Sequence, residues 1–177
     1  MIAQLDTKTV YTFMESLVTL KDYVQKAKSL RYDALGMMDV DNLYGAYEFI
    51  EACQEANLKP IVGLELELEL GNETIPFRML ALSTKGYQNL MKMSTVKMMG
   101  KSNWEDVKHL TEGVAVIVPA PFASEELALG LDYLIGVFVD SPVQVFSHPV
   151  IPLHTVRFFE AGDMEAMQML AAIKENQ

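Results

Sequence analysis

The sequence predicts a single α/β domain in which buried strands alternate with amphipathic helices from end to end. Near-continuous apolar runs at Tyr32–Met38 and Val114–Val118 are typical of strands that are buried on both faces. The segments between such runs repeat apolar residues at helical spacing, as in Leu20, Val24 and Ala27. This alternation favours one mostly parallel sheet covered by helices. Six or seven strands without a glycine-rich phosphate loop fit an irregular barrel better than a nucleotide-binding sheet.

The first part of the chain contains recognisable helix start and stop signals. Residues 1–5 are expected to form a short strand. Thr19, with Asp22 three residues later, has the spacing of a capping box that opens a helix. Asn42 is in a position to cap a second helix, which is expected to end near Asn57.

A change of period in the middle of the chain predicts a hairpin. Leucines alternate with Glu65, Glu67 and Glu69, which is the period of two of a half-buried strand. Gly71-Asn72 supplies a turn, after which a second apolar segment returns. The two outer glutamates fit a solvated face, whereas Glu65 stands where the buried part of the strand ends.

The second half continues the same alternation. Asn103 is expected to cap a short helix, Ser124 to start another, and Asp163 to cap the last. Further strands are expected around residues 133–139, 143–146 and 148–153. A methionine-rich helix carries one predicted apolar side, made of Tyr87, Leu90, Met91, Ser94 and Met98. The last helix is expected to turn its apolar residues inward, namely Met164, Met167, Leu170 and Ala171.

Composition limits the classes of protein that the chain can represent. Half of its 177 residues are apolar, so it is expected to be globular, and no apolar run approaches the length of a membrane span. A single cysteine, Cys53, excludes a disulfide framework and suits a cytoplasmic location. The formal net charge of −10 argues against direct, strong binding of nucleic acid by this segment.

The residues available for catalysis or metal binding are few. His109, His148 and His154 are the only histidines, and none is spaced as a metal-binding pair. His109 is expected on a helix surface. Cys53 has no nearby histidine in the predicted arrangement, so we interpret it as a core residue and not as a nucleophile. Asp39 and Glu65 each stand at the end of a buried strand, where a (β/α) barrel places its site residues.

Several motifs carry a resemblance to a known family. These are the runs 32–39 (YDALGMMD), 42–45 (NLYG), 58–65 (LKPIVGLE) and 85–90 (KGYQNL), followed by Glu112-Gly113 before a strand. The chain resembles the N-terminal PHP (polymerase and histidinol phosphatase) domain of the alpha subunit of bacterial DNA polymerase III, the C-family replicative polymerase. The resemblance implies a distorted seven-stranded (β/α) barrel over residues 1–177, as an N-terminal fragment of a longer polymerase chain.

The resemblance also locates the positions where metal-binding members of the family carry their ligands. A His-x-His pair is replaced by Asp6 and Lys8, and an Asp-His pair by Asp39 and Val40. The glutamate is kept as Glu65. A further histidine, a cysteine and a final Asp-x-His correspond in this chain to the residues Arg78, Ala120 and Thr155-Val156-Arg157. Only Asp39 and Glu65 remain as ligand types, so no metal or other cofactor is expected.

The replacements suggest how the remaining carboxylates are neutralised. Carboxylates in a partly buried pocket are costly without compensating charge. We therefore hypothesise that side-chain cations replace the metals and form a salt-bridge cluster from Asp6, Lys8, Asp39, Glu65, Arg78 and Arg157. The alternative is that these positions carry exposed, unpaired charges.

Three functions follow as expectations. The first is a structural or docking domain of a replicative polymerase, whose partners are the rest of the polymerase chain and replisome proteins. The second is a metal-dependent phosphoesterase or 3′–5′ proofreading exonuclease, which requires clustered metal ions. The third is a stand-alone binding protein. The parent chain resembles a DNA-directed DNA polymerase, a nucleotidyltransferase, but no catalytic residue is expected within this segment.

Overall fold

The structure is a computed structural model, and it describes residues 2–123, 131–138 and 148–175. The chain forms two compact units, one made of Met1–Ile61 with Thr155–Gln177 and the other of Val62–His154. The helix predicted from Ser124 and the strand predicted at 143–146 lie outside the described residues.

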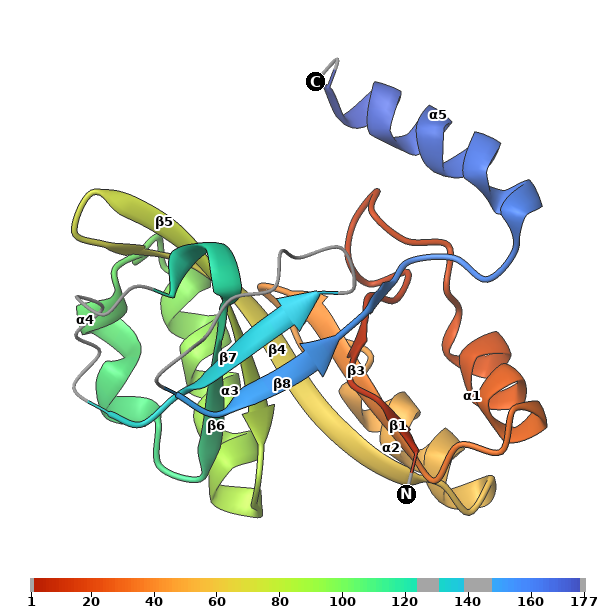
Figure 1. Cartoon of the computed structure of the whole chain (residues 1–177), viewed down its shortest axis with the longest axis horizontal. Coiled ribbons are helices and arrows are strands. Elements are labelled where there is room, and N and C mark those ends of the chain that lie inside the picture. Colours follow the sequence, from red (N-terminus) through yellow and green to blue (C-terminus); the bar gives the residue numbers. More distant parts are fainter. Residues whose placement is uncertain (1, 124–130, 139–147, 176–177) are drawn as a thin grey trace. The chain divides into compact units, whose positions relative to one another are not determined.

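The first unit is built on short parallel pairs of strands (Figure 1). Strand β1 (Ala3–Gln4) pairs with β3 (Ala34–Val40), and β2 (Asp6–Thr7) pairs with β9 (Thr155–Val156), in both cases in parallel. Six of the seven residues of β3 are buried. Only glycine fits at Gly36, because a Cβ there would lie 2.3 Å from the backbone oxygen of Leu5. The backbone of β3 therefore packs closely against Leu5, the residue before Asp6.

Two helices of the first unit pack against each other, α1 (Leu20–Ser29) and α2 (Ala46–Glu55) (Figure 1). The predicted cap of α1 is confirmed, since the Thr19 side chain accepts a hydrogen bond from the Asp22 backbone nitrogen at 3.2 Å. Tyr23 of α1 stacks on Phe49 of α2 with ring centroids 6.3 Å apart. The hydroxyl of Tyr23 donates to the Gly36 backbone oxygen at 3.0 Å, which ties α1 to β3.

The cap predicted for α2 is wrong. The helix follows Gly45, which makes no side-chain cap. Asn42 instead closes the preceding turn: its amide donates to the backbone oxygens of Tyr11 and Val40 and its oxygen accepts from the Tyr44 nitrogen. A short polar side chain of this kind stabilises turns as readily as helix ends, so the same residue type fits both roles. Asn57 has a positive φ of 57°, consistent with the predicted helix end.

The second unit contains the predicted hairpin. Strand β4 (Lys59–Leu70) begins in the first unit and continues into the second, where it pairs antiparallel with β5 (Glu73–Ala81). The turn is Gly71-Asn72, in which Gly71 has a φ of 63°, and Leu70 pairs with Glu73 on either side of it. Counting back from this turn places Glu65 opposite Arg78. The outer two glutamates are exposed, as predicted.

The rest of the second unit adds strands and helices around this hairpin. Strand β6 pairs antiparallel with β5, β7 pairs parallel with β6, and β8 pairs parallel with β7. The bounds are α3 Thr84–Met98, α4 Trp104–Val107, η1 Lys108–Leu110, β6 Val114–Pro119, η2 Ala120–Phe122, β7 Leu134–Phe138 and β8 Val150–Leu153. Asn103 caps α4 as predicted, and Trp104 is buried against Phe77 with ring centroids 4.9 Å apart.

The strand order in the main sheet is β1-β3-β4-β5-β6-β7-β8. Among the described residues the main sheet has seven strands, and β2 and β9 form a separate pair, which confirms the predicted α/β class and the number of strands in the sheet. Antiparallel pairing of β5 with both of its neighbours makes the sheet mixed. In the described part of the chain, no helix is long and apolar enough to span a membrane.

The predicted burial of two helices is wrong in part. On α3, Leu90 and Ser94 are buried as expected, but Met91 and Met98 are exposed. The last helix, α5 (Met164–Glu175), follows the short helix η3 (Ala161–Asp163) and has no buried side chain. Its apolar residues at 164, 167, 170 and 171 were expected to face inward, but Met164 and Ala171 are exposed and Met167 and Leu170 are only half-buried.

Candidate functional site

Lys8 and Asp6 form a buried ion pair at the end of β2. The Lys8 ammonium lies 2.9 Å from the Asp6 carboxylate, and both side chains are 0% exposed. The ammonium also donates to the Met38 backbone oxygen at 2.6 Å. The second carboxylate oxygen of Asp6 accepts from the Thr155 hydroxyl at 2.7 Å. A buried charge requires a counter-charge and hydrogen bonds, and this pair has both.

Asp39, near the end of β3, is held by hydroxyl and backbone donors. Its Oδ1 accepts from the Thr9 nitrogen at 2.6 Å and from the Thr12 hydroxyl at 2.7 Å. Its Oδ2 accepts from the Thr9 hydroxyl at 2.7 Å. These bonds to a charged acceptor fasten the segment that follows β2 onto the end of β3. The sequence reasoning missed both threonines, although hydroxyl residues directly after a strand are a recognisable signal for such contacts.

Arg157, which follows β9, contacts a residue that the sequence reasoning did not consider. Its guanidinium donates to the Glu15 carboxylate at 2.6 Å, and Lys174 of α5 donates to the other oxygen of the same carboxylate. Burial would raise the pKa of Glu15, but the hydrogen bonds and charges of Lys174 and Arg157 outweigh it, so this pKa lies below its usual range. Glu15 thus joins the 9–18 segment to the last helix.

Replacing Glu15 with glutamine is expected to loosen α5. Because the pKa of Glu15 is lowered in the folded state, its stabilising contribution is present above the unfolded-state pKa and is lost as pH falls through the folded-state pKa. The partly exposed pairs are together worth about 0.5–1 kcal/mol. Amide hydrogen exchange in α5 should therefore be faster in Glu15→Gln at neutral pH, and the difference from the parent protein should vanish in acid.

Glu165→Gln is the matched control for this prediction, since Glu165 lies in the first turn of the same helix. It should leave exchange near the end of α5 unchanged. Equal exchange in the parent protein and in Glu15→Gln at neutral pH would show that the ion pairs do not hold the helix.

Glu65 and Arg78 form the second buried ion pair, within the hairpin. The two residues are paired across β4 and β5. A guanidinium nitrogen of Arg78 lies 3.1 Å from a carboxylate oxygen of Glu65, and each side chain is 8% exposed. The Arg78 guanidinium lies 4.8 Å from the centroid of the Phe138 ring, a cation–π contact, and it donates to the Pro76 backbone oxygen at 3.3 Å. The guanidinium is thus fixed by an aromatic face as well as by its carboxylate.

The described residues do not supply a set of metal ligands. Within residues 2–123, 131–138 and 148–175 no group of three or more His, Cys, Asp or Glu side chains is placed to hold a metal ion. His109 is exposed on a short helix, as predicted, and His148 stacks on Tyr133 at 4.2 Å. Cys53 is buried, and burial raises the pKa of its thiol to about 12, so it remains a protonated core residue.

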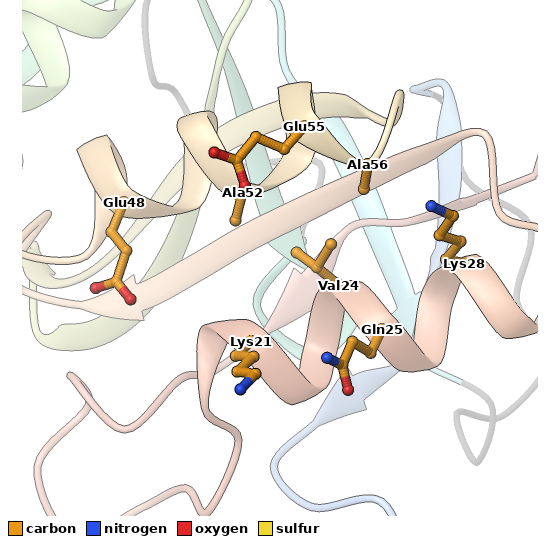
Figure 2. Close-up of a pocket in the computed structure, with 8 residues that line it drawn as sticks. All are labelled: Lys21, Val24, Gln25, Lys28, Glu48, Ala52, Glu55 and Ala56. Atoms are coloured by element: carbon orange, nitrogen blue, oxygen red, sulfur yellow. The ribbon is translucent and has the colours of Figure 1, made fainter.

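A shallow groove runs between α1 and α2 (Figure 2). Its floor is formed by Val24, Ala52 and Ala56. Figure 2 shows charged side chains along both helices at its sides, two lysines on α1 and two glutamates on α2, namely Lys21, Lys28, Glu48 and Glu55. With charges of both signs on the rim and a small apolar floor, the groove lacks the convergent groups of a catalytic site.

The family model and the relatives similar in sequence agree on the family of this chain. The model of the PHP domain family matches residues 4–140. The chain is 45% identical, over 99% of its length, to the DNA polymerase III subunit alpha of Streptococcus pyogenes, and it spans 17% of that relative. It is 34% identical to the subunit of the same name from Mycoplasma genitalium, over 67% of this chain and 13% of the relative.

Solved structures with the same fold are more distant in sequence. A protein from Bifidobacterium adolescentis, described by its name as a metal-dependent phosphoesterase, matches with a TM-score of 0.59 and 12% identity over 98% of this chain and 84% of the other. An amidohydrolase from Chromobacterium violaceum matches with a TM-score of 0.57 and 10% identity over 96% and 97%. At such identities the likeness concerns the fold alone. The match of the family model over residues 4–140 shows that the chain belongs to the PHP domain family.

Proposed function

We propose that residues 1–177 form the PHP domain of a DNA polymerase III alpha subunit, as part of a longer polymerase chain, and that this domain has a structural or docking role in chromosomal DNA replication in the cytoplasm. The observation that carries this proposal is the buried ion pair of Lys8 with Asp6. It stands where the family resemblance places metal-binding histidines.

The chemistry of Lys8 supports the absence of a metal. An ammonium group has three donors and no lone pair, so it cannot be a ligand while it is protonated. Its charge also repels a divalent cation at short range, an effect that burial strengthens. The Lys8 ammonium already bonds to Asp6 and to the Met38 carbonyl. The residues present therefore do not fit the metal cluster of a phosphoesterase.

The two remaining carboxylates of the family pattern are also engaged. Glu65 is paired with Arg78, and Asp39 accepts three hydrogen bonds from Thr9 and Thr12. We propose that cations and hydroxyl donors together have taken over the charge-balancing role of the metals. Arg157 pairs with Glu15, and the same carboxylate pairs with Lys174 of α5.

The last helix supports a docking role. Met169 and Ile173 of α5 are 57% and 51% exposed, and no side chain of this helix is buried. Exposed apolar residues on one helix are typical of a surface that another protein segment covers. The chain spans only 17% of its Streptococcus pyogenes relative, so we propose the remainder of the polymerase chain as the segment that covers α5. Replisome proteins are further candidate partners, whereas this acidic chain is not expected to bind DNA strongly by itself.

Metal analysis and a nuclease assay test the proposal. The purified protein should contain no stoichiometric transition metal, and a chelator should leave its unfolding temperature unchanged. A 3′-labelled oligonucleotide should not be shortened in the presence of Mn²⁺, Zn²⁺ or Mg²⁺.

The opposite result would favour a metal-dependent phosphoesterase or 3′–5′ exonuclease. In that case turnover would be abolished by the chelator and by both Glu65→Gln and Asp39→Asn. Turnover that survives both substitutions would indicate a contaminating nuclease.

A further inference from the structure

Four large apolar side chains of the first unit are exposed on two neighbouring segments. Val10 and Phe13 lie on the segment after β2, and Tyr44 and Tyr47 lie on the turn before α2 and on its first turn. Phe13 is 72% exposed, Tyr44 66% and Tyr47 71%. Large aromatic side chains in a group are enriched at the centres of protein interfaces. Together with Glu48 and Glu51, we call this group the aromatic–acidic surface.

Contacts between the two segments hold this surface together. The Asn42 amide donates to the Tyr11 backbone oxygen at 3.0 Å. The Tyr11 ring lies against Gly45 so closely that a Cβ there would be 2.5 Å from a ring carbon. The Tyr11 hydroxyl donates to the Glu48 carboxylate at 3.0 Å. The Thr12 hydroxyl donates a hydrogen bond to Asp39 and so anchors the segment next to Phe13.

The exposed ring of Tyr47 is itself held in place. Its hydroxyl donates to the Glu51 carboxylate, one helical turn further along α2, at 2.6 Å. This hydrogen bond and the nearby negative charge raise the pKa of Tyr47. An exposed aromatic ring with a fixed orientation loses little conformational entropy when a partner covers it.

The two segments that carry the four apolar side chains hold charged side chains of one sign, and the nearby Arg157 and Lys174 are already paired with Glu15. Residues 9–14 and 41–51 contain Asp41, Glu48 and Glu51 and no lysine or arginine. Lys21 of α1 shares the neighbouring groove with Glu48, and it lies on the far side of that groove from α2 (Figure 2). Carboxylates beside aromatic rings attract a guanidinium or ammonium group and repel phosphate. This chemistry favours a cationic peptide over a nucleic acid.

We propose that the aromatic–acidic surface is a docking site for a peptide segment of a partner protein that carries arginine or lysine beside apolar residues. The cations would lie over the tyrosine rings and pair with Glu48 and Glu51, while an apolar neighbour would pack on Phe13 and Val10. The inference deepens the docking role proposed above by naming a surface and the chemistry of its partner. It does not depend on the state of the metal site, so each proposal can fail without the other.

Fluorescence anisotropy with two labelled peptides tests this site. The probes are GRLRAFRLRG and the matched peptide GELEAFELEG, each titrated with the 177-residue protein at low salt and again at higher salt. The arginine peptide should bind saturably and more weakly as salt rises, and the glutamate peptide should not bind. Tyr44→Ala and Tyr47→Ala should each weaken binding about tenfold, and Glu51→Gln should weaken it several-fold.

Leu82→Ala is the matched control, because Leu82 is an exposed apolar residue of the second unit and should not affect binding. All variants should unfold at the temperature of the parent protein, since the exchanged side chains are exposed. Equal binding of both peptides, binding that survives Tyr44→Ala and Tyr47→Ala, or no binding of the arginine peptide would overturn the proposal. A labelled oligo-dT is titrated in the same way. If it binds more tightly than the arginine peptide and is weakened by the same substitutions, that result would overturn the proposal and identify the surface as a nucleic-acid site.

Discussion

Replacing Lys8 with methionine is expected to lower the free energy of unfolding by roughly 3–5 kcal/mol. Methionine keeps the length of the lysine stem, so the loss comes mainly from the charge and not from a cavity. Both partners are fully buried, and without the ammonium the Asp6 carboxylate keeps the Thr155 hydroxyl but loses its counter-charge at 2.9 Å. Urea unfolding at neutral pH measures the difference.

The double variant Asp6→Asn with Lys8→Met separates charge from packing. If the cost of Lys8→Met comes from a stranded carboxylate, removing that charge as well should restore most of the lost stability. Lys28→Met, at an exposed lysine of α1, is the control and should change stability by less than about 0.5 kcal/mol. A cost below about 1 kcal/mol for Lys8→Met would mean that this ion pair does not stabilise the domain.

The elements that local patterns encode were predictable from the sequence. The capping residues Thr19 and Asn103 and the hairpin turn Gly71-Asn72 are set by residues close in the chain. The hairpin also fixes its own register, since a two-residue turn with Leu70 opposite Glu73 requires Glu65 opposite Arg78. That pairing follows from counting and needs no tertiary information.

The polar contacts between distant segments were not predictable in the same way. Arg157 reaches Glu15 and Asp39 is bonded by Thr9 and Thr12, although the sequence offers several equally plausible partners for each. The family resemblance predicts which residues stand at former ligand positions, but it does not predict which neighbouring residue balances the charge of each one. The helix α5 shows a related limit, because an apolar stripe predicts burial without saying whether the covering surface belongs to the same domain.

Replacing Asp39 with alanine is expected to lower the free energy of unfolding by roughly 3–5 kcal/mol, because three buried donors lose their charged acceptor. Each such hydrogen bond is worth about 1.5–3 kcal/mol, and the contributions are not additive. The donors are the Thr9 nitrogen and the hydroxyls of Thr9 and Thr12. Asp39→Asn should cost less, since its remaining oxygen can still accept from two of them. Thermal and urea unfolding of both variants give the comparison.

This substitution also separates a structural role of Asp39 from a metal-binding one. If Asp39 serves as an anchor, Asp39→Ala should speed hydrogen exchange in residues 9–14, which carry Val10 and Phe13. It should also weaken the binding of the arginine peptide. Glu67→Gln, at an exposed position of β4, is the control and should have neither effect. If Asp39 served as a metal ligand, its replacement would instead remove bound metal. In metal-free protein, the replacement would then leave hydrogen exchange in residues 9–14 unchanged. The three short bonds from Thr9 and Thr12 favour the first outcome, in which the carboxylate at the end of β3 acts as the attachment point for the loop that bears the docking surface.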